Sequence, residues 1–523
     1  MKHHILFLLI VPLLAACVEE KGNYAYTERP GFTISGIPEL VEVLGNVERL
    51  ALQPVITSRT GEIIKGDDPN FSFLYRTGYR DTLARVMTLD TMANFTSGTY
   101  DCWFTATDRR TGLAASASFT LKVTSTVYEG YMVLCNEGPE ERARLDMIAR
   151  ISADRVVTAH DVMPALGLPT IHRAASIAYN QTGYTGTGTV IYLLTREGGY
   201  LLDETTFTTD PDREIKSYHF VVPPPDNERI IYYRALVGTG DMWGPKATFA
   251  ISDAGNAYAQ FFGSAGAAFE SPINTSAPVG DPEFRVAPFV GFSPARPGNG
   301  STALFYDIDN RRFVGWTYGA NEAARKVLFP LADPAGALFS YQTGMELLHM
   351  EGTRYSGGLV YALLKDDAGK RVIYGVNMSG NGFAQEAKYE NLNAPDLDRA
   401  TAYAFHSQYP FFFYAVDNKV YLHNLGANAT YLQSAPALAP TEEITLLKFN
   451  LYKQINLGAL SDQSEEFMSR QFELIVGSYD NAAADHNGGK LGLYPVNGVN
   501  NSISKRLEYS GFARVVDVVY RER

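Results

Sequence analysis

Paired strand-like runs joined by tight turns recur along most of this chain. In the clearest example the apolar run Phe-Phe-Phe-Tyr-Ala-Val starts at Phe411, turns at Asp417-Asn418 and continues as an alternating run to His423. β-Branched and aromatic residues on both sides of a dipeptide that tolerates left-handed backbone angles predict a β-hairpin. A chain that repeats this unit is expected to be all-β.

The spacing of the hairpins predicts how they assemble. Their turns lie roughly 50 to 65 residues apart, and each unit has room for four strands, which is the period of a propeller blade. We therefore predict a seven-bladed β-propeller over residues 125–523, with six or eight blades and a pair of large β-sandwiches as alternatives. The units lie around residues 131–148, 190–199, 247–262, 303–316, 359–374, 411–423 and 472–494.

The end of the chain predicts how such a ring closes. Residues 511–520 form one more apolar strand pattern, and no hairpin partner follows it. A last strand that completes the first blade would remove the open edges of the ring.

Residues 29–124 have a different strand pattern. Short alternating runs begin at Phe32, Leu50 and Phe71, and two longer ones cover residues 97–108 and 114–123. Seven or so short strands in about 95 residues predict an immunoglobulin-like β-sandwich.

The first residues predict a targeting segment. Lys2 supplies positive charge, the apolar run that follows is too short to span a bilayer, and Leu14-Ala-Ala-Cys17 has the form of a bacterial lipobox. We expect residues 1–16 to be a lipoprotein signal peptide, Cys17 to carry the lipid and residues 17–28 to form a tether. The alternative is an ordinary signal peptide that ends by chance in a cysteine.

Three motifs resemble a known family. Gly22-Asn-Tyr-Ala-Tyr26, the Leu-x-Leu-x-Pro of residues 50–54 and the Gly-x-Tyr to Phe-x-Leu-x-Val stretch of residues 98–123 resemble the PKD-like lipoproteins of Bacteroidetes. The resemblance implies a PKD-like sandwich and a surface lipoprotein that accompanies a SusC/SusD-like outer-membrane importer. Glu19-Glu20 resembles the acidic signal that sends such lipoproteins to the extracellular side. No catalytic residue is implied.

Charge and cysteine usage exclude several classes of function. The net charge of −12 argues against nucleic acid or an anionic membrane surface as a partner. Cys102 and Cys135 fall in different predicted domains, each in an apolar run, so buried thiols are expected rather than a disulfide. No histidine has metal-ligand spacing, and Gly183–Gly188 lacks the lysine of a phosphate loop. We expect no metal and no cofactor.

Few residues suggest chemistry. The closest carboxylate pairs lie in turns, where aspartate is favoured for its local hydrogen bonds. Tyr232, Tyr233 and Trp243 surround a Pro-rich stretch and are candidates for an aromatic lip that binds a ligand, with core packing as the alternative. Thr82 and Thr91 each follow an aspartate in a short motif that Bacteroides-type organisms O-glycosylate. The carboxylate pairs are Asp67-Asp68, Asp307 with Asp309, and Asp366-Asp367.

Two classes of function remain open. The first is a non-catalytic accessory subunit of a nutrient importer, lipid-anchored in the outer membrane, that captures an oligosaccharide or an oligopeptide. The second is a propeller-type glycoside hydrolase or lyase whose residues are scattered over blade loops. Carboxylates, tyrosine or histidine converging in the central channel would favour the enzyme.

Overall fold

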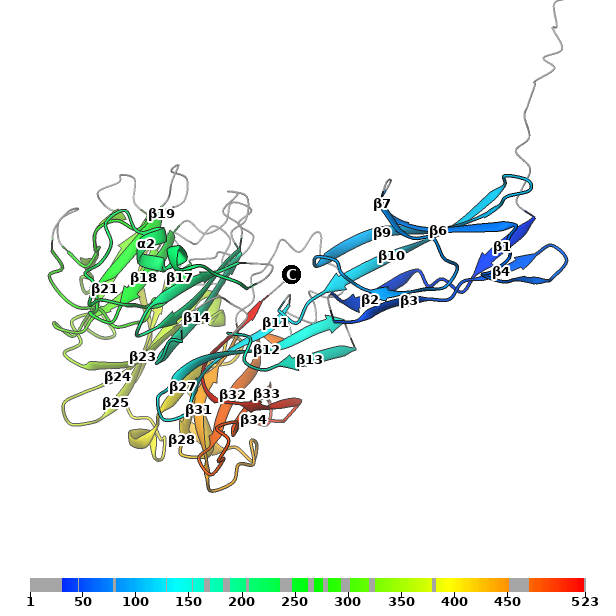
Figure 1. The fold of residues 1–523 in the computed structure, drawn as a ribbon. Coiled ribbons are helices and arrows are strands. Elements are labelled where there is room, and N and C mark those ends of the chain that lie inside the picture. Colours follow the sequence, from blue (N-terminus) through cyan, green and yellow to red (C-terminus); the bar gives the residue numbers. More distant parts are fainter. Residues whose placement is uncertain are drawn as a thin grey trace, which may run out of the picture. The chain divides into compact units, whose positions relative to one another are not determined.

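A computed structural model gives the fold of the chain in two compact units, Met1–Thr124 and Ser125–Arg523 (Figure 1). Helices in the described ranges are short, and none is long and apolar enough to cross a membrane. The helical segments are α2 (Ile215–His219) and the 3-10 turns Pro211–Arg213, Tyr355–Gly357 and Leu397–Arg399. The structure describes residues 31–45, 47–78, 81–127, 129–152, 154–163, 170–181, 189–203, 207–235, 247–261, 268–275, 281–292, 302–318, 325–378, 382–450 and 470–521.

The first unit packs three sheets around one apolar core, as predicted for a sandwich. Its longer strands alternate between buried and partly exposed residues because only one face of each sheet meets the core. The sheets are β2-β10-β9-β6-β7, β1-β4-β5 and β3-β8. The strands are β1 (Phe32–Ser35), β2 (Leu40–Leu44), β3 (Arg49–Leu52), β4 (Val55–Ser58), β5 (Ile63–Ile64), β6 (Phe71–Thr77), β7 (Asp81–Ala84), β8 (Leu89–Met92), β9 (Gly98–Asp108) and β10 (Ala114–Thr124).

The second unit contains seven antiparallel sheets in its described residues, one for each predicted hairpin. We number them blades 1 to 7. Blade 1 contains β11 (Gly130–Glu137), β12 (Arg142–Ser152), β13 (Arg155–Ala159) and β36 (Arg514–Arg521), and blade 2 contains β14 (Ala174–Gln181), β15 (Thr189–Thr195) and β16 (Gly199–Leu202). Blade 3 contains β17 (Ile230–Ala235), β18 (Ala247–Ser252) and β19 (Ala257–Phe261), and blade 4 contains β20 (Thr302–Asp307), β21 (Arg312–Thr317) and β22 (Phe329–Pro330).

The remaining three blades follow the same order along the chain. Blade 5 contains β23 (Glu346–Gly352), β24 (Leu359–Lys365), β25 (Arg371–Asn377) and β26 (Ala384–Tyr389). Blade 6 contains β27 (Ala402–Phe405), β28 (Phe411–Val416), β29 (Lys419–Asn424) and β30 (Ala429–Leu432). Blade 7 contains β31 (Glu442–Lys448), β32 (Glu473–Asp480), β33 (Gly489–Asn497), β34 (Ser502–Ile503) and β35 (Leu507–Phe512).

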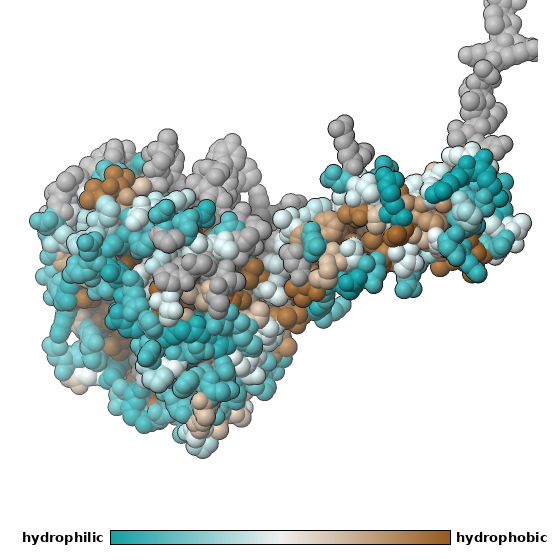
Figure 2. Space-filling view, in the orientation of Figure 1, coloured by the Kyte–Doolittle hydropathy of each residue, from teal (hydrophilic) through white to brown (hydrophobic). Residues whose placement is uncertain are grey.

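Seven apolar clusters lie between successive blades, and one of them joins blade 7 to blade 1. This arrangement makes the unit a closed seven-bladed propeller. It also explains the continuous apolar runs in the sequence, because a blade strand is buried on both faces. In β28, Phe412 and Tyr414 pack toward blade 5 while Phe411 and Phe413 pack toward blade 7. The visible face of this unit is mostly hydrophilic (Figure 2).

The last strand closes the ring, as predicted. β36 pairs antiparallel with β11, so the end of the unit completes its first blade (Figure 1). The predicted strand over residues 511–520 is wrong in one respect: Gly511 and Phe512 belong to β35 in blade 7, and β36 starts at Arg514. Gly511 has a φ of +87°, a left-handed conformation that suits glycine, and it is the residue left unpaired at the register shift between β35 and β33.

A repeated hydrogen bond fixes the entry to three blades. The backbone N–H groups of His172, Arg229 and Arg285 donate to carboxylates in the hairpin turns of blades 2, 3 and 4, over 2.9, 2.9 and 2.7 Å. The acceptors, Glu197, Asp253 and Asp309, follow 24 or 25 positions later in the sequence.

Candidate functional site

The innermost strands of the blades line the central channel of a propeller, and two carboxylates join neighbouring ones. Asp517 on β36 accepts the N–H of Ile177 on β14 over 3.0 Å. Glu351 on β23 accepts the N–H of Phe405 on β27 over 2.8 Å. These two acids hold blade 1 to blade 2 and blade 5 to blade 6.

Lysine and histidine side chains accompany these carboxylates. Lys448 on β31 lies 2.6 Å from an oxygen of Asp517, and its ammonium also donates to the carbonyl of Val518 over 2.7 Å. His349 lies 3.4 Å from Glu351. Each channel carboxylate therefore has a basic neighbour as well as a backbone donor.

Tyr232 packs against the core between blades 3 and 4. Burial raises the pKa of this phenol, and the charges of Asp517 and Glu351 raise it further, while Arg234 and a hydrogen bond to the backbone of Val290 act in the opposite direction. Tyr232, Glu351 and Asp517 belong to blades 3, 5 and 1. The charges of two distant blades therefore act on this side chain.

Three half-buried rings extend the channel wall across blades 4 to 6. The ring centroids of Phe289 and His349 lie 5.4 Å apart, and those of His349 and Tyr403 lie 6.0 Å apart. The innermost segment of blade 4 carries Phe289, and bridges at Val286 and Gly291 join this segment to β20.

An open cleft of about 380 Å³ lies between blades 4 and 5, next to this row of rings. Its wall is polar and apolar in nearly equal parts, and Arg311 and Glu346 supply its charge. Arg311 pairs with Asp367 over 2.6 Å, which raises the pKa of the guanidinium, and Glu346 pairs with Lys365 over 2.5 Å. The lining residues are Ala287, Pro288, Phe289, Tyr306, Ile308, Arg311, Met345, Glu346 and Leu347.

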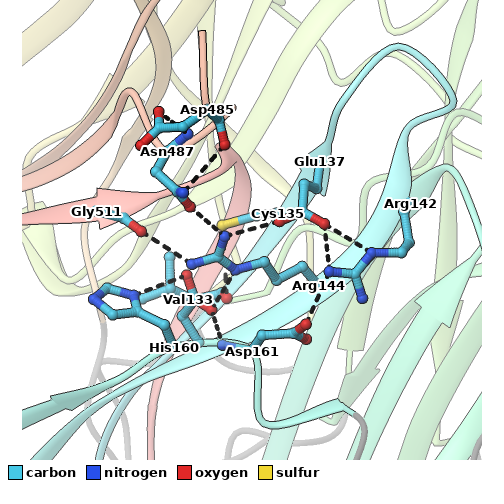
Figure 3. Close-up of polar contacts among 11 residues, drawn as sticks. Val133, Cys135, Glu137, Arg142, Arg144, His160, Asp161, Asp485, Asn487 and Gly511 are labelled. Atoms are coloured by element: carbon cyan, nitrogen blue, oxygen red, sulfur yellow. Dashed lines mark hydrogen bonds and ion pairs between the residues drawn. The ribbon is translucent and has the colours of Figure 1, made fainter. Parts of the chain in front are cut away.

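A second polar cluster lies where the propeller closes, and Figure 3 shows that its partners are all protein groups. The guanidinium of Arg144 donates to Asp146, Glu137, Asn487 and the carbonyl of Gly511 over 2.6–3.0 Å. The side chains of Arg144 and Asp146 are 4% and 0% exposed. We interpret this closure cluster as a structural element, because its donors are already satisfied.

The structure disperses the residues that the sequence suggested. Tyr232 packs against the core between blades 3 and 4. Tyr233 belongs to the core between blades 2 and 3 and is 6% exposed. Thr82 and Thr91 are exposed on β7 and β8, so the glycosylation prediction stays open. Cys17 and Trp243 lie outside the described residues.

The carboxylate pairs and cysteines have structural surroundings. Asp307 is fully buried and accepts hydrogen bonds from Asp309, Asn310 and Arg312 within its own hairpin. Cys102 and Cys135 are free, buried thiols. Within the described ranges, no group of three histidine, cysteine or acidic side chains is placed to hold a metal ion.

Comparison with known proteins identifies the first unit. Residues 17–166 match the PKD-like family. The N-terminal unit is a PKD-like domain. The match extends beyond Thr124, so it also covers β11–β13 of the propeller. No protein of curated function matches the chain.

Solved structures of similar architecture are distant in sequence. A quinonprotein alcohol dehydrogenase-like protein from Bacteroides thetaiotaomicron is 12% identical, with 93% of this chain and 94% of that chain covered and a TM-score of 0.40. A putative 6-phosphogluconolactonase from Bacteroides fragilis is 10% identical, with 76% and 99% covered and a TM-score of 0.41. The assignment as a propeller rests on the seven sheets and seven interblade cores described above.

Several residues of the channel and cleft were missed by sequence reasoning. Arg234, Phe289, Glu351, Lys448 and Asp517 lie far apart in the sequence and in no recognisable motif. Four of them lie on or beside the first strand of their blade, and Asp517 lies on β36, the last strand of the chain. A search limited to the first strand of each repeat, just after the preceding loop, would have found those four.

Proposed function

We propose that this protein is a non-catalytic binding subunit, anchored in the outer membrane by a lipid on Cys17 and displayed on the extracellular side. Its propeller captures an oligosaccharide or oligopeptide for a SusC/SusD-like importer. The lipobox and the acidic residues after it support the location, and the PKD-like match supports the resemblance to lipoproteins of this kind.

The cleft between blades 4 and 5 carries the binding proposal. A partly apolar wall with an aromatic ring at Phe289 and charged groups at Arg311 and Glu346 suits a ligand that is both ring-bearing and polar. Sugars and peptides both have this character, and aromatic faces bind either of them.

The state of the channel carboxylates favours binding over catalysis. A glycosidase needs one acid free to donate a proton and a second free to attack or to activate water. Asp517 is held by Lys448 and the Ile177 N–H, and Glu351 is held by the Phe405 N–H. Both carboxylates therefore already accept a hydrogen bond that links neighbouring blades.

The charges of Glu351 and Asp517 act on Tyr232, and His349 lies 3.4 Å from Glu351; this group supports an enzyme as the second candidate. A glycoside hydrolase or lyase acting on extracellular glycans would use this group. Incubation of the purified protein with plant and host glycans, followed by mass spectrometry of the products, decides between the candidates. Cleavage that Glu351→Gln abolishes without unfolding the protein would establish the enzyme.

The binding proposal is tested by screening the purified full-length protein against arrays of oligosaccharides and oligopeptides. We expect saturable binding to members of one of these two classes. If no oligosaccharide and no oligopeptide on the arrays binds, the proposal is contradicted.

The proposed location and partner need a separate test. Tagged protein is extracted from outer membranes in detergent, and what co-purifies with it is identified. We expect the native protein to co-purify with a SusC/SusD-like pair in stoichiometric amounts. The Cys17→Ser variant, which cannot carry the lipid, is expected in the soluble fraction without this pair. Recovery of the lipidated protein alone would contradict the importer partnership.

A further inference from the structure

Arg234 lies on β17, the innermost strand of blade 3, and has no anionic partner among the described residues. Its side chain is half-buried, and the guanidinium carbon lies 4.7 Å from the ring centroid of Phe292, the residue after the innermost segment of blade 4. Throughout the described residues, no hydrogen bond or ion pair joins Arg234 to an acceptor. Its five N–H donors are therefore directed at no protein group that the structure describes.

Two other cations of the propeller are paired with carboxylates. Lys448 pairs with Asp517 over 2.6 Å, and Arg506 pairs with Glu473 over 2.5 and 2.6 Å. A partly desolvated charge without a hydrogen-bonding partner costs free energy. An acceptor from outside the described residues, such as a bound ligand, would remove this cost at Arg234.

The carboxylates nearest in the channel are already engaged. Asp517 is bound by Lys448 and by the N–H of Ile177, and Glu351 accepts the N–H of Phe405. The hydroxyl of Tyr232, two residues before Arg234 on the same strand, is also engaged, since it is bonded to the backbone of Val290. Arg234 therefore offers one planar cation beside an aromatic ring.

We infer that the channel binds a carboxylate group of the ligand through Arg234, with the guanidinium held flat by Phe292. A guanidinium fork matches the two oxygens of a carboxylate, and stacking on an aromatic face fixes the plane of the fork. This inference rests on the proposed binding function and narrows its ligand to acidic molecules. A uronic acid of an oligosaccharide and the terminal carboxylate of a peptide supply the same group.

Matched acid and neutral probes test the inference by calorimetric titration of the full-length protein in detergent. The sugar arm compares trigalacturonic acid with its methyl ester, and the peptide arm compares N-acetyl-trialanine with its amide. We expect the acid of one arm to bind and its neutral partner to bind at least about tenfold more weakly, since a charge-assisted hydrogen bond is worth that much.

Variants assign the effect to the side chain. Arg234→Met is expected to remove the preference for the acid, Arg234→Lys to keep part of it, and Lys419→Met, which removes an exposed cation in a hairpin of blade 6, to leave it unchanged. Equal melting temperatures would show that the variants are folded.

Three results would overturn the inference: equal binding of acid and ester, an unchanged preference in Arg234→Met, or no binding of either acid. If one of these three results is found and the protein still binds a neutral ligand from the array screen, the proposed binding function stands and only the role of Arg234 is wrong.

Discussion

His406 illustrates how burial sets the chemistry of a single side chain. The ring is fully buried, and Nδ1 accepts the backbone N–H groups of Gln408 and Tyr409 over 3.0 and 3.1 Å. Nε2 lies 3.2 Å from the carbonyl oxygen of Phe472, so we assign the proton to Nε2. Burial lowers the pKa of His406 to about 4. The folded protein therefore holds this imidazole in its neutral form.

This lowered pKa predicts acid sensitivity. Below pH 6.5 the unfolded chain takes up a proton on His406 that the folded chain refuses until about pH 4, so the free energy of unfolding falls as the pH drops through that window. His406 alone accounts for a loss of about 2 kcal/mol at pH 5. Burial lowers the pKa values of His219 and His423 to about 4 as well, so they act in the same direction.

The measurement is urea unfolding at pH 7, 6 and 5 for the native protein and for His406→Gln. We expect the variant to be less stable at pH 7 but to lose less of its remaining stability on acidification. Identical pH slopes for both proteins would show that His406 is not a source of the acid sensitivity.

Arg144 gives a second prediction at the scale of one residue. Arg144→Met leaves the fully buried carboxylate of Asp146 without its cation, which should lower the free energy of unfolding of the propeller by about 3 to 5 kcal/mol. Chemical unfolding measures this directly. The control is Arg285→Ala, whose partner is Asp309 on the surface and which should cost less than about 1 kcal/mol. Equal costs would contradict the structural role of the closure cluster.

At the scale of elements, β36 determines whether seven hairpins become one closed body. Its residues Val515, Val518 and Tyr520 belong to the core between blades 7 and 1. Deletion of residues 514–523 should therefore abolish the cooperative unfolding of the propeller and expose the edge of β11. Adding a synthetic peptide of the deleted residues should restore part of the transition.

Scanning calorimetry and limited proteolysis measure the effect of the deletion, and the PKD-like domain, which has its own core, is expected to resist protease in both proteins. A truncated chain with an unchanged propeller transition would contradict the importance of closure.

The elements were largely predictable from the sequence because their signals are local. The hairpin at Asp417 has its predicted left-handed residue, with a φ of +54°. The exact start of the last strand was not predictable, since the boundary at Ala513 falls inside a pattern that reads as one apolar run. The backbone bonds to Glu197, Asp253 and Asp309 were also missed, although their regular spacing is present in the sequence.

At the scale of the whole molecule, the site depends on which blades become neighbours. Tyr232 was suggested by its aromatic surroundings; in the structure it packs against the core between blades 3 and 4, and the charges of Asp517 and Glu351 that act on it come from two other blades. The cleft combines residues from blades 4 and 5 that are ordinary turn and strand residues in the sequence. Local sequence patterns contain no information about contacts between residues of different blades, so the sequence predicted the scaffold but not the cleft.

The measurement that tests the binding account most directly is the dissociation constant of the tightest ligand from the array screen, compared between the native protein and Phe289→Ala. Loss of the ring should raise the dissociation constant about tenfold or more, because burying a phenylalanine ring against a ligand contributes ~1.5 kcal/mol or more. The control is Tyr431→Ala, which removes a partly exposed aromatic ring on β30, far along the chain from the cleft. A tenfold effect at Phe289 with none at Tyr431 is what the account predicts; equal affinity in all three proteins would contradict ligand capture in the cleft.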